Sequence, residues 1–497
     1  MERETKKVTK KKKTQKQKIV EQFLFMLDWL ILAVTLAAAT MVLVKVQVMG
    51  ILPAKFFVPI VILFLILLGL GVFFTIKKKG QIPIIIVSVI MLGILIYGAL
   101  AIGKLDKTLN ELNNVTTKSM VFSVVVRDDD PAKSLSDIDG YDVGYYKNEE
   151  KIYDANKKLK SELGKVSVNM KSYDSQDAIV ESLLNSKSLG AIFLNQTSIA
   201  LISDSEEYEN FEEETRVIGT VTITYQVKVN DNSDAELGDT LVVYMSGIDT
   251  YGAVDITSRS DVNILAFINV KTGKIQLIST PRDYYVQCPL HDNAYDKLTN
   301  CGLYGIDCSE DTLEQLYGGD FEIDYYLRVN FSGFIDIIDE LGGVDVTNET
   351  AFTSVDGMYF EAGDLHLDGQ AALYFARERK AFAAGDIMRA KHQMAVISAM
   401  VKKCTSSKEI LTNYANILDA VSECFQTDMP ASIIYQLVNH QLSSGTSWDI
   451  QSYTLEGEGT RSTEAYSQYG RSTYVMLQDA DMIAEAKKLI DEVLSGN

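Results

Sequence analysis

The chain has 497 residues, 47% of them apolar, and a formal net charge of −20 at pH 7. Residues 1–104 hold 15 basic and 4 acidic side chains, a net charge of +11, whereas the other 393 residues hold 32 basic and 63 acidic ones, a net charge of −31. The acidic part argues against a nucleic-acid-binding protein, which needs basic surface to neutralise phosphates. The apolar content and the scarcity of proline exclude a chain that is disordered throughout.

Three long apolar runs lie in the first hundred residues, at 23–44, 56–76 and 82–103. Each has 21 or 22 residues, and about 20 are needed for a helix to cross the hydrocarbon core of a bilayer. Three such runs in succession favour membrane spans over the alternative, a set of helices buried in a soluble core. We therefore expect a basic tail at 1–19 and three transmembrane helices within 20–104.

Basic residues flank these runs unevenly. Residues 1–18 carry nine basic side chains and the link between the second and third runs contains lysines 77–79, whereas the first link has only two lysines. Because strongly basic loops stay in the cytoplasm, the pattern predicts a multi-pass protein of the cell membrane with a cytoplasmic N-terminus. The rest of the chain is then extracellular.

The segment after the apolar runs predicts a stalk and a small accessory domain within 105–235. Residues 105–120 are polar and form the expected stalk. Strand-like runs are at 121–126, 143–146, 166–168, 190–194 and 220–228, with helical patterns at 148–164 and 176–186. This alternation is typical of an α/β module. The acidic run 204–214 is interpreted as a solvated face rather than a metal site.

A predicted hairpin brings two charged residues together near the middle of the chain. Strands are expected at 241–245, 263–270 and 275–279, and a turn centred on Thr272 and Gly273 joins the last two. This turn pairs Asn263 with Arg282, and it places Asp261 within side-chain reach of Arg282. The inference depends on register and would fail with a bulge.

Further basic residues follow two predicted helices. The first helix spans 369–375 with Asp368 as its N-cap, and the second opens at Gly385 and Asp386, with Asp386 as N-cap. Arg389 and Gln393 lie one turn apart on the same face of the second helix. In an extended segment between the helices, Arg377 and Arg379 would project to one face.

Four arginines could therefore converge, namely Arg282, Arg377, Arg379 and Arg389. Guanidinium groups bind phosphate oxygens through paired hydrogen bonds, and a helix N-terminus also favours a phosphate. Spacing alone does not decide between an anion site and a set of surface ion pairs. However, residues 377–391 hold five basic and two acidic side chains within a strongly acidic body. Such a basic island favours an anionic ligand.

At these residues the sequence resembles the LytR-CpsA-Psr family of cell-wall ligases. The matching elements, in chain order, are Gly247-Ile248-Asp249, Asp261 with VNILAFINV, Ser279-Thr280-Pro281-Arg282-Asp283, Lys297 in DKLTN, Tyr325-Tyr326 before VNFSGFIDIIDELGGVDV, AALYFARERK, and GDIMRAKHQ. The resemblance is strong over 240–404 and looser toward the C-terminus, and it places a catalytic domain at 236–497. One departure is His392, where many members have another arginine.

The resemblance implies a fold and an activity. The fold is α/β, with a central mixed β-sheet flanked by helices. The activity transfers a glycopolymer, with one phosphate, from a polyprenyl-pyrophosphate carrier to a peptidoglycan hydroxyl outside the membrane of Gram-positive-type bacteria. Teichoic acids and capsular polysaccharides are the usual cargoes. The expected partners are this lipid-linked polymer and the peptidoglycan acceptor, with no nucleic acid, and the oligomeric state is left open.

The resemblance also implies roles for individual residues. The pyrophosphate would be held by Arg282, Lys297, Arg377, Arg379, Arg389 and Gln393. Asp249 and Asp261 would bind Mg²⁺ or Mn²⁺, and one of them, Asp249 in preference, would accept the proton of the attacking hydroxyl. Phosphoryl transfer needs this combination of positioning and charge neutralisation. Asp386 is a secondary candidate for an acid/base or orienting role, and helix capping explains it equally well.

Two other activities fit the same residues. One is a non-catalytic regulator that binds polyprenyl pyrophosphate, and the other is a pyrophosphatase or hydrolase that releases the polymer to water. The presence of both metal carboxylates and all four arginines favours an enzyme over the regulator, because binding alone does not need both carboxylates. Hydrolysis stays open, because the same site serves water and the sugar hydroxyl.

Five cysteines lie in the part of the chain that we expect outside the membrane, where disulfides can form. Their separations match no standard zinc pattern, so structural disulfides are the favoured interpretation. We expect one bond between Cys404 and Cys424, and one between two of Cys288, Cys301 and Cys308.

Overall fold

The computed structural model describes residues 15–496 except 78–80, 114–116, 227–234, 249–257, 384, 407–424 and 469. Contacts divide the chain into two compact units. One comprises Met1–Lys107 and Ser432–Gly445, and the other comprises Thr108–Ala431 and Thr446–Asn497.

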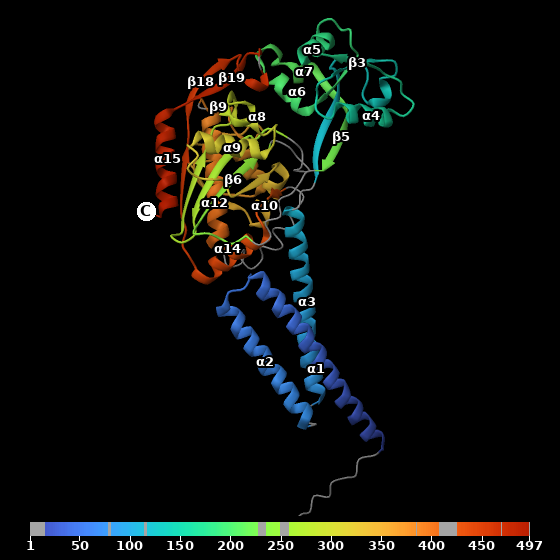
Figure 1. Ribbon diagram of the computed structural model, residues 1–497, viewed down its shortest axis with the longest axis vertical. Coiled ribbons are helices and arrows are strands. Elements are labelled where there is room, and N and C mark those ends of the chain that lie inside the picture. Colours follow the sequence, from blue (N-terminus) through green and yellow to red (C-terminus); the bar gives the residue numbers. More distant parts are fainter. Residues whose placement is uncertain are drawn as a thin grey trace, which may run out of the picture. The chain divides into compact units, whose positions relative to one another are not determined.

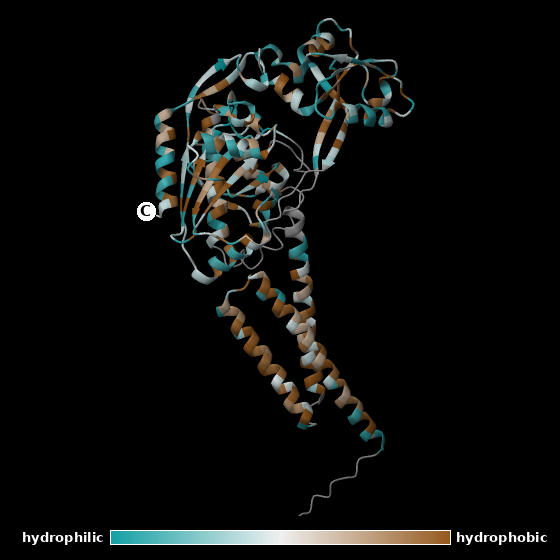
Figure 2. Cartoon of the chain, viewed as in Figure 1, coloured by the Kyte–Doolittle hydropathy of each residue, from teal (hydrophilic) through white to brown (hydrophobic). Residues whose placement is uncertain are grey.

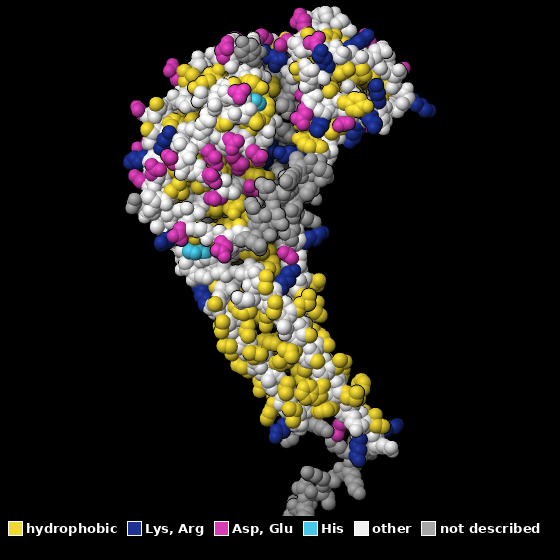
Figure 3. All heavy atoms as spheres, in the orientation of Figure 1, with side chains coloured by type: hydrophobic (Ala, Val, Ile, Leu, Met, Phe, Trp, Pro, Cys, Tyr) yellow, Lys and Arg dark blue, Asp and Glu magenta, His cyan; other side chains and the backbone are white. Residues whose placement is uncertain are grey.

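The first unit contains three long apolar helices, α1 (Gln15–Met49), α2 (Ala54–Lys77) and α3 (Gln81–Asn113), together with most of α14 (Ala431–Ser444). By length and composition, α1, α2 and α3 can each cross a membrane. Apolar residues predominate along these helices in Figure 2 and are frequent on the face that Figure 3 shows, and α2 leaves Ile62, Leu63 and Ile66 more than half exposed. Such a surface suits lipid rather than water. The three apolar helices are confirmed, and their orientation stays a prediction.

The second unit begins with a five-stranded sheet in the order β3-β2-β4-β1-β5. Its strands are β1 (Thr117–Arg127), β2 (Asp142–Tyr146), β3 (Asn169–Tyr173), β4 (Ala191–Asn195) and β5 (Thr215–Gln226). Its helices are α4 (Ile152–Leu163), α5 (Gln176–Leu184), α6 (Gln196–Ser203) and α7 (Phe211–Glu214). We call residues 117–226 the accessory module. The predicted α/β alternation is confirmed.

One detail of the predicted alternation is wrong. The strand expected at 166–168 lies at β3 instead, because Val166 and Val168 pack against the core and the pairing with β2 starts only at Asn169. Helix α3 continues to Asn113, so it includes the first part of the expected stalk.

The rest of the second unit is built on a six-stranded mixed sheet in the order β16-β11-β6-β7-β8-β17. Its strands are β6 (Thr240–Gly247), β7 (Val262–Asn269), β8 (Lys274–Ser279), β11 (Tyr325–Val329), β16 (Phe425–Thr427) and β17 (Asp449–Thr454). β7 is antiparallel to β6 and β8, whereas β11 and β17 run parallel to their neighbours β6 and β8. This arrangement confirms the predicted α/β fold with a central mixed sheet.

Helices and short hairpins surround this sheet (Figure 1). The apolar faces of α9 (Ile306–Leu316) and α15 (Ala480–Ser495) pack on side chains of β6, β7 and β8 to form the main core. A second apolar cluster lies among α10 (Phe331–Glu340), α11 (Gly369–Arg377) and α12 (Asp386–Ser406). The remaining named elements are α8 (Leu298–Cys301) and the pairs β9 (Tyr285–Cys288) with β10 (Ala294–Lys297), β12 (Val344–Asn348) with β15 (Gly363–Leu367), β13 (Phe352–Thr353) with β14 (Tyr359–Phe360), and β18 (Gly457–Ser462) with β19 (Thr473–Gln478).

The hairpin of β7 and β8 has a different register from the predicted one. Asn269 pairs with Lys274, so the turn holds four residues and the predicted register is wrong by two. Gly273 supplies the positive φ of 71° that this turn requires, and the Asn269 side chain accepts a hydrogen bond from the Thr272 N–H. Continued past the strand ends, the observed register puts Asp261 opposite Arg282, so the expected proximity of these two residues is confirmed by their ion pair.

His392 lies inside the second apolar cluster rather than at a polar surface. Its side chain is only 6% exposed, and its ring stacks on Phe375 at 4.2 Å and on Phe352 at 5.1 Å between centroids. Burial lowers the pKa of this imidazole, although its Nδ1 lies 3.2 Å from the Phe375 carbonyl oxygen. The residue is therefore a packing element of α12, and it forms no substitute for a phosphate-binding arginine.

We predict that His392→Arg destabilises the protein by about 3 kcal/mol, because it buries an unpaired charge among aromatic rings. His366→Arg is the matched control, since the His366 side chain is 59% exposed beside Asp345, and its effect should stay within about 0.5 kcal/mol. Thermal and urea unfolding of the detergent-solubilised protein measures both changes. Equal stability of His392→Arg and wild type would contradict the buried placement.

Glu310 on α9 lies among other acidic groups. Burial and the nearby carboxylates of Asp428 and Asp307 raise the pKa of Glu310 from 4.5 to about 8. Burial also raises the pKa of Asp428 to about 6. Because the folded protein holds the Glu310 proton more tightly than the unfolded chain, its contribution to stability is complete below pH 4.5 and is lost as the pH rises toward 8.

Glu310→Gln should therefore stabilise the protein by about 2 kcal/mol at pH 9 and by much less at pH 4, because glutamine mimics the protonated acid. Unfolding curves of the two proteins at both pH values measure the difference. A gain that is the same at both pH values would show that the carboxyl does not titrate between them.

Candidate functional site

A small cavity of about 20 Å³ lies beside the start of β7 and the end of β8. The residues that line it include Asp261, Asn263, Arg282, Arg389 and Gln393. The first three are placed by the β7–β8 hairpin, and the last two by the first turns of α12. The structure thus brings four of the predicted site residues, Asp261, Arg282, Arg389 and Gln393, to one cavity.

An ion pair between Arg282 and Asp261 forms one wall of this cavity. Arg282 Nη1 lies 2.8 Å from Asp261 Oδ2, and the two side chains are 13% and 14% exposed. The other carboxylate oxygen of Asp261 accepts a hydrogen bond of 3.0 Å from Thr299 Oγ1. Backbone bonds secure both residues, because the Asp261 N–H donates to the Gly247 carbonyl and the Thr299 N–H donates to the Arg282 carbonyl. The guanidinium is held in a defined orientation at the cavity edge.

Arg389 and Gln393 reach the cavity from the beginning of α12, as their spacing predicted. The positive end of a helix dipole adds to the charge of Arg389 and favours an anion there. Asp386 is the first residue of α12, but its side chain lies outside the described residues. Its capping and acid/base roles stay predictions.

Arg377 and Arg379 are placed differently. Arg377 ends α11, and its guanidinium lies over the Phe331 ring at 4.1 Å from the ring centroid. Arg379 is exposed. Among the described residues, neither belongs to the lining of the cavity. Their predicted contact with pyrophosphate is untested.

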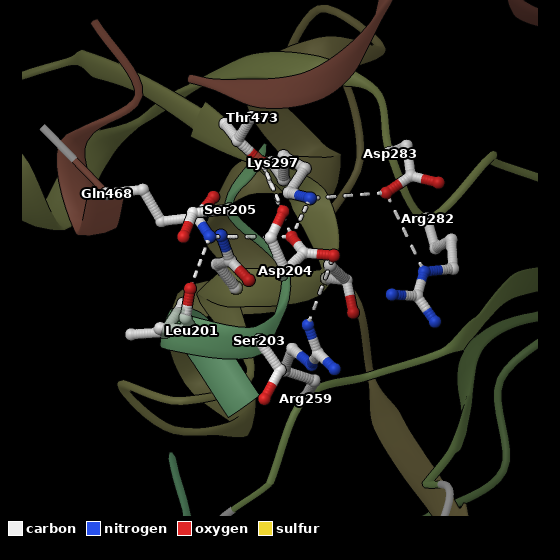
Figure 4. A network of polar contacts seen from close by, with 12 residues as sticks. Leu201, Ser203, Asp204, Ser205, Arg259, Arg282, Asp283, Lys297, Gln468 and Thr473 are labelled. Carbon is white, nitrogen blue, oxygen red and sulfur yellow. Dashed lines mark hydrogen bonds and ion pairs between the residues drawn. The ribbon is translucent and has the colours of Figure 1, made fainter. Parts of the chain in front are cut away.

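Lys297 is buried next to the cavity and does not line it. Its side chain is only 1% exposed, and its ammonium forms an ion pair with Asp204 of the accessory module (Figure 4). A second carboxylate, that of Asp283, lies 3.7 Å away. The interpretation of the acidic run 204–214 as a solvated face is therefore wrong at its first residue, because the Asp204 carboxylate meets a buried cation.

Three contributors to this region were missed in the sequence. Arg259 Nη1 lies 3.8 Å from Asp204 Oδ1, Asp283 contacts both Arg282 and Lys297, and Thr299 binds Asp261. Asp283 directly follows Arg282, and Thr299 lies in DKLTN two residues after Lys297, so their positions in the motifs were an available signal. Arg259 stands two residues before Asp261, outside the matching elements, and carried no such signal.

The donor set at the cavity is suited to a hard divalent cation. Asp261 supplies carboxylate oxygens, and Mg²⁺ commonly binds through one or two carboxylates plus phosphate oxygens and water. The other predicted ligand, Asp249, lies outside the described residues. The chain just before it runs beside Asp261, because Gly247 pairs with Val262 and accepts the Asp261 N–H. Asp261, the described member of the predicted pair, is chemically suited to Mg²⁺ or Mn²⁺, and the metal itself stays a prediction.

Three buried cysteines converge behind this region. The Sγ atoms of Cys288, Cys301 and Cys308 all lie within 4.8 Å of one another, and those of Cys288 and Cys308 are 3.2 Å apart. All three are free thiols in the structure, so the predicted disulfide among them is not formed. The Cys288 and Cys308 sulfur atoms therefore touch without forming a covalent bond. The other predicted bond involves Cys424, which lies outside the described residues.

Comparison with known proteins extends the resemblance. The sequence matches the LytR_cpsA_psr family over residues 199–483. The polyisoprenyl-teichoic acid–peptidoglycan teichoic acid transferase TagU of Bacillus cereus is 31% identical over 261 residues, which make up 51% of this chain and 83% of TagU. TagU of Halalkalibacterium halodurans is 32% identical over 47% of this chain and 75% of that protein.

Solved structures are also similar to about half of this chain. The crystal structure of TagV from B. subtilis aligns with 52% of this chain and 98% of TagV, at 27% identity and a TM-score of 0.44. The family match covers more than half of the chain and includes the cavity residues of β7, β8 and α12. The chain therefore belongs to the LytR_cpsA_psr family.

Proposed function

We propose that this protein transfers a glycopolymer, with one phosphate, from a polyprenyl-pyrophosphate carrier to a hydroxyl of peptidoglycan at the outer face of the cell membrane. The observation that carries the proposal is the cavity where Arg282, Asp261, Arg389 and Gln393 meet. Family membership supports it, as do relatives that are named as teichoic acid transferases. Three apolar helices suit a substrate that is itself anchored in the membrane.

The charged residues around the cavity support binding of the pyrophosphate. Arg282 and Arg389 present guanidinium groups from two different elements, so the diphosphate can be held from two sides. Gln393 adds an amide donor one helical turn from Arg389. Partial burial strengthens these interactions, because water screens them less than at an open surface.

A divalent cation, Mg²⁺ or Mn²⁺, would be held by Asp261 and Asp249 and would neutralise charge that develops on the phosphate oxygens. Asp261 needs a defined orientation for this role, and the hydrogen bonds from Arg282 and Thr299 provide it.

In the transfer step, the peptidoglycan hydroxyl oxygen attacks the phosphorus that carries the polymer. A new P–O bond forms, the bridging P–O bond to the lipid phosphate breaks, and polyprenyl phosphate leaves with that electron pair. The hydroxyl proton passes to a carboxylate. Both oxygens of Asp261 already accept hydrogen bonds from protein donors, so we propose Asp249 as the proton acceptor.

We predict that Arg282→Ala and Asp261→Ala each reduce ligation by about 10²–10³-fold, because each removes stabilisation of charge in the transition state. Lys488→Ala is the control, since Lys488 is an exposed cation paired with Glu485 on α15, and its rate should equal that of wild type. The assay supplies lipid-linked glycopolymer, Mg²⁺ and peptidoglycan to the full-length protein in detergent or vesicles.

The products decide between the possible activities. Polymer bound covalently to the glycan supports the transferase, whereas polymer released free would indicate hydrolysis. Binding of the lipid without turnover would indicate a regulator. Unchanged ligation by Arg282→Ala or Asp261→Ala would contradict the site.

A further inference from the structure

Asp204 connects the accessory module with the region around the cavity. It lies directly after α6, and its carboxylate accepts hydrogen bonds from Lys297 and, at 3.5 and 3.4 Å, from Gln468 Nε2 and Thr473 Oγ1. Arg259 approaches the other carboxylate oxygen at 3.8 Å. Figure 4 shows these donors arranged around Asp204. Several side chains distant from α6 in the sequence are thus directed at one carboxylate of the accessory module.

A chain of ion pairs leads from Asp204 to the cavity. Lys297 Nζ contacts Asp204 and lies 3.7 Å from Asp283 Oδ1, and the same Asp283 oxygen lies 3.7 Å from Arg282 Nε. Arg282 then pairs with Asp261 at 2.8 Å. The charges alternate along this path, so a change at Asp204 alters the balance that orients Arg282.

The burial of Lys297 is the reason why we expect this series of ion pairs to depend on Asp204. A buried ammonium needs a carboxylate partner, because an unpaired charge in the interior is strongly destabilising. Burial alone would raise the pKa of Asp204, but Lys297, Arg259 and Arg282 outweigh it and hold the pKa below its ordinary value. Without Asp204, the ion-pair partner of Lys297 that remains among the described residues is Asp283.

We propose that Asp204 is a positioning residue for the cavity: it keeps the Lys297 ammonium from moving closer to Asp283 than 3.7 Å, and thereby leaves Asp283 and Asp261 to orient Arg282 toward the pyrophosphate. This inference rests on the proposed function and deepens it, since it makes the accessory module part of the binding site. In this series of ion pairs, the buried Lys297 ammonium lies between the carboxylates of Asp204 and Asp283.

The accessory module offers a matched control. Arg471 Nε lies 2.7 Å from Asp177 Oδ1, and the Arg471 side chain is 10% exposed. This second ion pair also joins α5 of the accessory module to the segment before β19. It involves none of the residues that lead to Arg282. Asp177→Asn therefore weakens a second contact of the accessory module, but it changes none of the ion pairs between Asp204 and Arg282.

The experiment measures binding of geranyl pyrophosphate with Mg²⁺ to the full-length protein in detergent. Asp204→Asn should weaken binding about tenfold, as a lost charge partner in a coupled network does. Asp177→Asn should change binding less than about twofold, and Asp204→Glu should recover most of the lost affinity. Asp204→Asn combined with Lys297→Met restores the local charge balance and should bind more tightly than Asp204→Asn alone. Thermal unfolding of every variant reports folding separately.

Three results would overturn the proposal. Equal losses of binding affinity in Asp204→Asn and Asp177→Asn would show that Asp204 acts only by attaching the accessory module. Tighter binding by Asp204→Asn would show that its carboxylate competes with the diphosphate. No recovery in the double variant would mean that Lys297 itself binds the ligand. Wild-type protein that binds geranyl pyrophosphate but does not ligate polymer would contradict the proposed function alone, and the inference would still be decided by the binding of the variants.

Discussion

The site depends on the ion pair between Arg282 and Asp261, and that pair depends on the register of one hairpin. Four turn residues between β7 and β8 put the two side chains opposite each other past the strand ends. A shift of one residue would turn one of them to the other face of the sheet. Because both side chains are mostly buried, the pair is screened weakly and keeps its geometry. The pair forms one wall of the cavity. Asp261 also accepts a hydrogen bond from Thr299 and is the predicted metal ligand.

The same pair is central to our proposal that an acidic protein binds a diphosphate. Average charge describes the surface, but the cavity experiences only the charges within a few ångströms of it. Around Arg282 the basic and acidic side chains alternate, from Asp204 through Lys297 and Asp283 to Asp261. Arg389 at the start of α12 adds positive charge from another direction. The charged residues that line the cavity are two arginines, Arg282 and Arg389, and one aspartate, Asp261. We propose that this excess of one positive charge, completed by a divalent cation, offsets the charge of the substrate.

Local patterns in the sequence predicted most of the fold. Apolar length identified α1, α2 and α3, and alternation identified the accessory module and the β7–β8 hairpin. Helical spacing placed Arg389 and Gln393 on one face of α12, and both line the cavity. These features depend on neighbours in the sequence, which is why the sequence of this one chain was enough to predict them.

The features that were missed depend on tertiary packing. The predicted hairpin register was wrong because Thr272 and Gly273 were interpreted as a two-residue turn, whereas the observed turn holds the four residues 270–273. His392 follows the helical pattern of a polar face, yet the aromatic rings of Phe352 and Phe375 enclose it. Asp204 and Lys297 are separated by 93 positions, and no local signal indicates that such residues meet.

The most direct test of the account is a structure of the full-length protein with Mn²⁺ and geranyl pyrophosphate. The account predicts diphosphate density between Arg282 and Arg389, anomalous signal from Mn²⁺ beside Asp261, and an intact contact between Asp204 and Lys297. Diphosphate bound to Lys297 in place of Asp204, or bound away from the cavity, would contradict it.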